Sequence, residues 1–166
     1  MQCDLADIAS LQKTFASLNL TGFILVGYSM GGRAALSYSI KYPRQVKGLI
    51  LESANPGIKK KDGQNKRTKN DYQLSLMLEN EELATFLEYW YDQPIFSSLK
   101  KEQAQKLIQL RKSNNKYGLA KVLRNFSTGK MKNKWDELHN VKCETLLISG
   151  ELDEKYCKIA NQQSKR

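Results

Sequence analysis

Only one histidine, His139, is present among the 166 residues of the sequence. Enzymes that attack with a serine hydroxyl need a base to activate it, and histidine is the side chain used most often. A catalytic serine in this chain must therefore use His139 or obtain its base from elsewhere.

Cysteines are also few, and their number is odd. Cys3, Cys143 and Cys157 form no CxxC pair and no Cys/His pair with the spacing of a metal motif. The sequence therefore predicts reduced thiols, some of them packed in the core, with no disulfide framework and no metal.

Long hydrophobic runs are absent, since no segment approaches the roughly 20 apolar residues of a membrane-spanning helix. The amino terminus, MQCDLADIAS, has neither the basic segment nor the apolar core of a signal peptide. These absences predict a cytoplasmic chain with no membrane partner.

Basic residues exceed acidic ones, and the formal net charge is +10. Lysines and arginines are spread along the chain, and the densest run, Lys59 to Arg67, has no nucleic-acid-binding motif around it. We interpret this run as a solvated basic loop and expect no nucleic-acid partner. Steering of an anionic substrate is the alternative interpretation of the charge.

Apolar runs rich in β-formers predict three strands, at Phe23–Val26, Gly48–Ser53 and Thr145–Ser149. The first of these runs is wholly apolar, which is typical of a parallel strand buried on both faces. Helical periodicity predicts helices at Asp4–Leu18, with Asp4 as the N-cap, and at Arg33–Lys41. Parallel strands alternating with helices indicate an α/β fold.

The stretch from Asn55 to Val141 contains no convincing strand and has helical periodicity, for example at Tyr117–Phe126 and Met131–Leu138. A helical insertion after a strand of a parallel sheet is expected to form a lid over the strand ends. We therefore divide one incomplete domain into three parts: 1–54 with the first core strands, 55–140 as helical lid, and 141–166 with the last strand and helix.

The segment Gly27-Tyr28-Ser29-Met30-Gly31 fits the G-x-S-x-G nucleophile elbow, in which a serine occupies a strained turn between a strand and a helix. The apolar strand before the motif and the helical pattern after it are the context that this motif requires. Ser29 is therefore a candidate nucleophile, and the backbone N–H of Met30 is a candidate oxyanion donor.

In a triad on such a sheet, the acid follows a later strand and the histidine follows the acid. Asp153 lies in the loop after the strand at Thr145–Ser149, at the same carboxyl edge as Ser29; the alternative is that it only caps the next helix. His139 precedes that strand and enters at the amino edge, roughly 15 Å away along the sheet. We therefore expect His139 to have no catalytic role.

With these features in place, the chain resembles the α/β-hydrolase superfamily. Within it, the chain closely resembles the 2-succinyl-6-hydroxy-2,4-cyclohexadiene-1-carboxylate synthase family of menaquinone biosynthesis. The resemblance rests on the segments LVGYSMGGRAAL, LILESANPGI, WYDQPIF, LIQLRKSNN and LLISGELDEKY. It implies a carbon–oxygen lyase that uses no metal and no organic cofactor. The triad serine of such a lyase helps to remove a proton from the substrate, so that pyruvate is eliminated and a ring double bond forms.

Carried over residue by residue, the resemblance implies that Ser29 is the catalytic serine and Asp153 the acid. It also implies a substrate pocket for a small polycarboxylate, lined by Tyr28, Arg33, Arg67, Trp90 and Arg111. Arginine suits this role because its guanidinium group pairs bidentately with carboxylates. Taken singly, Arg67 and Arg111 would be interpreted as solvated helix residues and Trp90 as an aromatic of the lid core.

The family pattern has strands before Asp4, together with a final histidine and strand, that this sequence lacks. We therefore expect a fragment truncated at both ends that is inactive by itself and poorly soluble, with the missing segments of its own domain as its partner. Two other interpretations stay open. One is an ester or carbon–carbon bond hydrolase, which would use the same elbow, and the other is a non-catalytic protein that binds anionic ligands.

Overall fold

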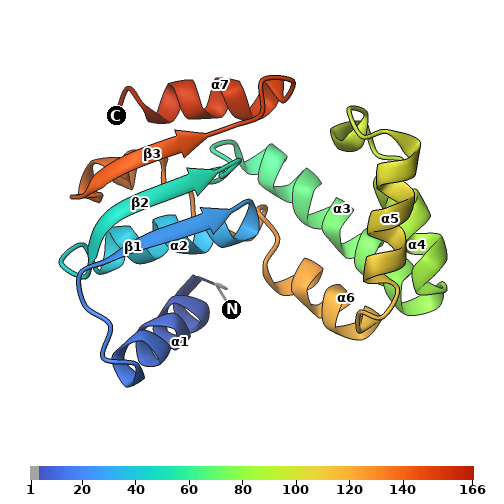
Figure 1. The fold of residues 1–166 in the computed structure, drawn as a ribbon, viewed down its shortest axis with the longest axis horizontal. Helices are drawn as coiled ribbons and strands as arrows, with labels where there is room; N and C mark the ends of the chain where they lie inside the picture. The colour runs from blue at the N-terminus through green and yellow to red at the C-terminus, as the bar shows by residue number, and fades with distance from the viewer. Residues whose placement is uncertain (1–3) are drawn as a thin grey trace. The chain divides into compact units, whose positions relative to one another are not determined.

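The computed structural model describes residues 4–166, and their side chains from Ile8 onward, so Cys3 and the side chain of Asp4 lie outside the described part. The chain forms two compact units. The core unit comprises the chain up to Gln64 together with Thr128–Arg166, and the helical unit comprises Asn65–Ser127. Figure 1 follows the order of the elements from one terminus to the other.

The core unit is built on a parallel three-stranded sheet with the strand order β1-β2-β3. Its strands are β1 (Phe23–Tyr28), β2 (Val46–Glu52) and β3 (Glu144–Ile148). The three predicted strands are thus confirmed within a few residues, and so is their parallel α/β arrangement. Because the strands are parallel, the residues that follow all three of them meet at one edge of the sheet.

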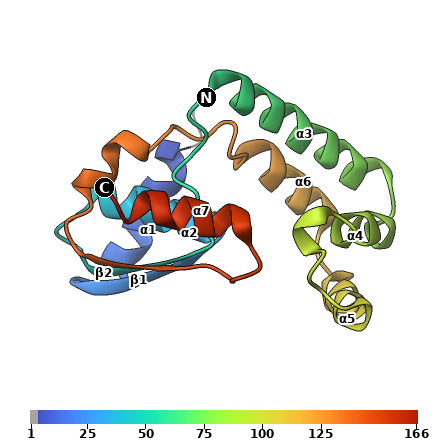
Figure 2. The ribbon, with the colours of Figure 1, turned by 90° about the horizontal axis from the view of Figure 1, so that it is seen from above.

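Helices cover one face of this sheet, as Figure 2 shows. They are α1 (Asp4–Ser17), α2 (Met30–Lys41), the short 3₁₀ helix η2 (Trp135–Asn140) and α7 (Glu154–Gln163). Leu36 of α2 packs against Leu49 and Leu51 of β2, and all three side chains are at most 2% exposed. This alternation of buried residues along β2 places the core between the sheet and α2.

The opposite face of the sheet is not covered by any described helix of the core unit. Ile24 and Val26 of β1 are each 65% exposed, and Leu146 of β3 is 55% exposed. The register pairs Val26 with Ile50 and Ile50 with Leu146, so these side chains form one apolar row across the sheet. The prediction that Phe23–Val26 is buried on both faces is therefore wrong, because the helices of this unit pack on one face only.

We expect Val26→Lys to reduce the binding of a hydrophobic dye and the self-association of the chain, because exposed apolar patches of this kind drive association. Its free energy of unfolding should change by less than about 1 kcal/mol. Leu49→Ala, on the covered face, should cost about 2–5 kcal/mol. Dye fluorescence, sedimentation and urea unfolding of both variants measure these effects. Equal destabilisation by the two substitutions would show that the face of the sheet that carries Val26 is covered.

Helix α3 (Lys61–Asn80) begins in the core unit and continues into the helical unit from Asn65. The helical unit also contains α4 (Leu83–Tyr91), the 3₁₀ helix η1 (Pro94–Phe96), α5 (Lys101–Arg111) and α6 (Lys116–Asn125). Its buried centre is made by apolar side chains of α3, α4 and α6, namely Leu78, Leu83, Phe86, Leu87, Tyr91 and Ala120. The expectation of helices in this stretch is confirmed. The basic run from Lys59 is not a loop, however, because α3 begins at Lys61.

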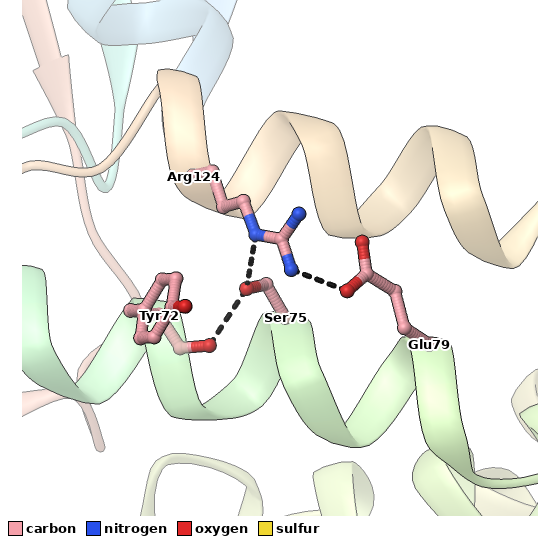
Figure 3. Close-up of polar contacts among 4 residues, drawn as sticks. All are labelled: Tyr72, Ser75, Glu79 and Arg124. Carbon is pink, nitrogen blue, oxygen red and sulfur yellow. Dashed lines mark hydrogen bonds and ion pairs between the residues drawn. The ribbon is translucent and has the colours of Figure 1, made fainter.

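Arg124 of α6 links α6 to α3 (Figure 3). Its Nε donates to Ser75 Oγ at 2.8 Å, and its Nη2 pairs with the carboxylate of Glu79. Ser75, which is fully buried, donates in turn to the carbonyl oxygen of Tyr72 at 2.6 Å. The Tyr72 ring lies 5.5 Å from the Arg124 guanidinium carbon. The Arg124 side chain is thus engaged in contacts within the helical unit.

The helix expected at Met131–Leu138 does not form over that range, and only η2, from Trp135, is helical. Lys134 N–H donates to Pro56 O at 2.8 Å, and the Trp135 indole donates to Gly57 O at 2.9 Å. Asn133 Oδ1 accepts from Trp135 N–H at 3.1 Å. These bonds, two of which reach the segment after β2, take the place of the helix that the periodicity predicted.

Candidate active site

Ser29 stands between β1 and α2 with φ 49° and ψ −109°, as the N-cap of the helix. A positive φ at a residue other than glycine stores strain of about 1–3 kcal/mol and marks candidate functional sites. Ser29 N–H donates to Glu52 O at 2.9 Å, and Ser29 O accepts from Arg33 N–H at 3.1 Å. The strained strand-to-helix turn that the motif predicted is therefore present, and its backbone is held on both sides.

Two glycines allow the helix to approach the strand. A Cβ added to Gly27 would lie 2.6 Å from Gly32 Cα, and one added to Gly32 would lie 2.6 Å from Ala54 Cβ. A Cβ on Gly31, in contrast, would meet nothing within 4 Å among the described residues. Close packing thus accounts for the first glycine of the motif and for Gly32, but not for Gly31.

Met30 is the first residue of α2, so its N–H belongs to the first turn, which has no acceptor within the helix. The positive end of the helix dipole lies at the same place, and no acidic side chain occupies this turn. The position therefore suits the stabilisation of a negative oxygen beside Ser29.

Asp153 follows β3 at the same edge of the sheet and is half-buried. Its Oδ1 accepts from Tyr156 N–H at 3.1 Å and caps α7, which is the alternative role considered from the sequence. With β2 between them, β1 and β3 lie about 10 Å apart. One imidazole with its two hydrogen bonds joins oxygens roughly 7 Å apart, so the Ser29 and Asp153 side chains need to reach only a short way toward each other. Capping and orienting a histidine are compatible because the carboxylate has a second oxygen.

His139 lies in η2, before β3 begins, and its side chain is exposed. Glu144 pairs with Gly48 at the start of β2, whereas Tyr28 pairs with Glu52 at its end. His139 and Ser29 therefore lie at opposite edges of the sheet, as the sequence predicted. Among the described residues of the core unit, no imidazole stands at the edge that carries Ser29.

Ser53 is a strained residue that the sequence did not reveal. It follows β2 with φ 46°, and its N–H donates to Ile148 O at 2.9 Å. It thus stands at the same edge as Ser29, one strand closer to Asp153. No motif marks it, since the only sequence signal is a serine just after an apolar strand.

The proposed pocket residues fall in both units. Tyr28 is 64% exposed and Arg33 lies one turn after Ser29, both in the core unit. Arg67 lies on α3 and pairs with Asp71. Trp90 stacks on Phe86 with ring centroids 5.9 Å apart.

Arg111 is the last residue of α5, and its guanidinium carbon lies 5.5 Å from the Tyr91 ring. Arg67, Trp90 and Arg111 all belong to the helical unit. Convergence of the three arginines Arg33, Arg67 and Arg111 on one cleft therefore stays a prediction.

Among the side chains described, from Ile8 onward, no three His, Cys, Asp or Glu groups cluster in a way that could hold a metal ion. None of the helices described within residues 4–166 is long and apolar enough to cross a membrane. Cys143 and Cys157 are free thiols, and burial raises the pKa of the Cys143 thiol above its ordinary value. Cys143 packs against the core beside Leu49, as expected for a filler of the core.

A parallel sheet that presents a serine on a strained strand-to-helix turn defines a protein of the α/β-hydrolase fold. The comparison with known families agrees with this class. The chain belongs to the family described as serine aminopeptidase, S33, whose model matches residues 3–164.

Relatives within this fold share a more specific name. A protein of Bacillus subtilis (strain 168), named as a candidate 2-succinyl-6-hydroxy-2,4-cyclohexadiene-1-carboxylate synthase, is 37% identical over 94% of this chain and 58% of its own length. The synthase of that name from Photorhabdus laumondii is 32% identical over 92% of this chain and 55% of its own length. The structure of MenH from S. aureus matches with a TM-score of 0.88 and 35% identity, over 95% of this chain and 60% of that chain. This chain therefore spans slightly more than half the length of the curated relatives it matches.

Proposed function

We propose that this chain carries the reacting serine of a lyase that forms 2-succinyl-6-hydroxy-2,4-cyclohexadiene-1-carboxylate and releases pyruvate. The observation that carries the proposal is the strained elbow at Ser29 in a chain whose relatives have the name of this synthase. The reaction needs a proton to be removed from a carbon of the substrate, and a serine activated by a base can do this.

The proposed division of work follows from the geometry of the core unit. Ser29 takes part in the proton transfer, and the Met30 N–H stabilises the negative oxygen that develops on the substrate. Asp153 orients the imidazole that activates Ser29. That imidazole comes from outside this sequence, because His139 stands at the opposite edge of the sheet. The chain by itself is therefore proposed to be inactive.

The substrate is proposed to be a small polycarboxylate, bound under a lid formed by residues 55–140. Arg33, Arg67 and Arg111 would pair with its carboxylates, and Tyr28 and Trp90 would line the pocket. Guanidinium groups suit this role because they bind carboxylates through two parallel hydrogen bonds. The formal net charge of +10 would also favour the approach of an anionic substrate.

The test is a chimera in which this chain replaces the matched part of S. aureus MenH. The chimera is offered the succinylated cyclohexene acid and, separately, a simple phenyl ester. We expect pyruvate release from the acid, with a kcat/KM well above that for the ester. Faster hydrolysis of the ester, without pyruvate release, would favour an ester hydrolase. Tight binding of the acid without turnover of either compound would favour a non-catalytic binding protein.

Arg67→Ala and Arg111→Ala in this chimera should each raise the KM for the acid by at least about tenfold, because a hydrogen bond to a charged group contributes roughly 1.5–3 kcal/mol. Steady-state pyruvate release measures the effect. Lys158→Ala, which removes an exposed cation of the core unit, is the control and should leave the KM unchanged. An unchanged KM in both arginine variants would contradict the carboxylate-binding role.

A further inference from the structure

Arg67 has an unusual contact for an arginine that is expected to bind a substrate. Its Nε donates to both carboxylate oxygens of Asp71, at 2.8 and 2.9 Å. Asp71 lies one turn further along α3, so the two residues share one face of the helix. The Asp71 side chain is only 2% exposed, whereas that of Arg67 is 39% exposed.

The shared Nε–H uses one of the five N–H donors of the guanidinium group. Asp71 is the only partner that Arg67 has within the described part of the chain. Both terminal Nη groups thus keep their four N–H donors, on the end of the guanidinium plane that binds carboxylates in the bidentate geometry. A ligand carboxylate could take this end without displacing Asp71.

Arg124 offers a comparison within the same unit (Figure 3). Its Nε is bound to Ser75, its Nη2 is bound to Glu79, and its guanidinium carbon lies near the Tyr72 ring. Arg124 thus uses both its Nε and its Nη2 in contacts that hold α3 and α6 together. Arg67, in contrast, uses only its Nε, which binds Asp71 of the same helix.

We propose that Asp71 is a positioning residue, whose buried carboxylate holds the Nε of Arg67 so that Nη1 and Nη2 bind a carboxylate group of the ligand end-on. This inference rests on the proposed function, in which Arg67 binds the substrate. Asp71 itself touches no ligand. Its fixed position restricts the rotation of the long Arg67 side chain, and less conformational freedom is then lost when the ligand binds.

The test uses the full chain labelled at the arginine side chains with nitrogen-15, and succinate as the dicarboxylate probe. NMR follows the Nε–H resonance of Arg67 and the apparent Kd for succinate. In the unsubstituted chain we expect a slowly exchanging Nε–H resonance and succinate binding that Arg67→Ala weakens at least about tenfold. Asp71→Asn should broaden or shift this resonance and weaken binding about fivefold, and Asp71→Glu should restore part of both.

Glu79→Gln is the matched control, because Glu79 lies on α3 like Asp71 but pairs with a different arginine, Arg124 of α6. It should leave the Arg67 resonance and the Kd for succinate unchanged. If Arg67→Ala weakens binding but Asp71→Asn does not, the positioning role is wrong and the proposed function stands. If succinate does not bind, or Arg67→Ala binds it equally well, the role of Arg67 in the proposed function fails as well. A rapidly exchanging Nε–H in the unsubstituted chain would overturn the inference without any variant.

Discussion

Ser29→Ala should lower pyruvate release by the chimera with S. aureus MenH about 10²- to 10⁴-fold, the range that a positioned acid–base group contributes. The fold should not change, because the contacts that hold the turn are made by the backbone of Ser29 and not by its side chain. Far-UV circular dichroism and urea unfolding check the fold, and single-turnover kinetics separate a loss of chemistry from a loss of binding.

His139→Ala is the matched control for this prediction. Its ring is exposed and precedes β3, so its removal should change pyruvate release less than about twofold and leave stability within about 0.5 kcal/mol. A large loss of activity in the His139 variant, with folding unchanged, would show that His139 takes part in catalysis despite its place at the opposite edge of the sheet.

Gly32→Val should destabilise the core unit by about 3 kcal/mol or more, or prevent folding. The new Cβ would lie 2.6 Å from Ala54 Cβ and 2.9 Å from Gly27 O, and neither neighbour is the end of a flexible side chain. Overpacking of this kind costs typically 1–3 kcal/mol, and a branched residue beside a backbone oxygen is at the upper end. Urea unfolding followed by circular dichroism measures the loss.

Gly31→Ala provides the comparison on the same turn of α2. Its Cβ would meet nothing within 4 Å among the described residues, so the substitution should be neutral or stabilise by up to about 1 kcal/mol through helix propensity. Equal losses of unfolding free energy in Gly31→Ala and Gly32→Val would mean that the start of α2 does not pack as closely against β1 and Ala54 as the structure shows.

The sequence predicted the elements in which local pattern and tertiary environment agree. The runs at Phe23, Gly48 and Thr145 are apolar and rich in β-formers, and all three became adjacent parallel strands. The G-x-S-x-G motif between a strand and a helix predicted the strained turn at Ser29. It did so because only a restricted set of residues allows that turn.

Features that depend on what packs against a segment could not be predicted. An apolar strand such as β1 has the same sequence whether one or both of its faces are covered, so the exposure of Ile24 and Val26 had no local signal. Ser53 adopts its positive φ where its N–H binds Ile148 O of β3, which is far away in the sequence and leaves no local signal. The basic run was predicted to be a loop, but it is helical from Lys61. The prediction failed because propensity and charge do not distinguish a solvated loop from a solvated helix.

Residues of the candidate site were predictable to different degrees. Ser29 and Asp153 lie at the carboxyl edge of the sheet, where the order of strands placed them. The contact between Arg67 and Asp71 has the i,i+4 spacing of a helix pair, but that spacing says nothing about which of the two side chains is buried. The proposed positioning role of Asp71 therefore needed the side-chain geometry.

We propose that this chain supplies the serine, the oxyanion N–H and the acid of a triad, but not its base. The most direct test compares pyruvate release from the succinylated cyclohexene acid by the 166-residue chain and by the chimera with S. aureus MenH, at equal protein concentration. We expect the chimera to release pyruvate, and the chain alone to release no more than its Ser29→Ala variant does. If the chain alone released pyruvate as fast as the chimera, and if Ser29→Ala abolished this release, the proposal would be wrong, because the base would then lie within this sequence.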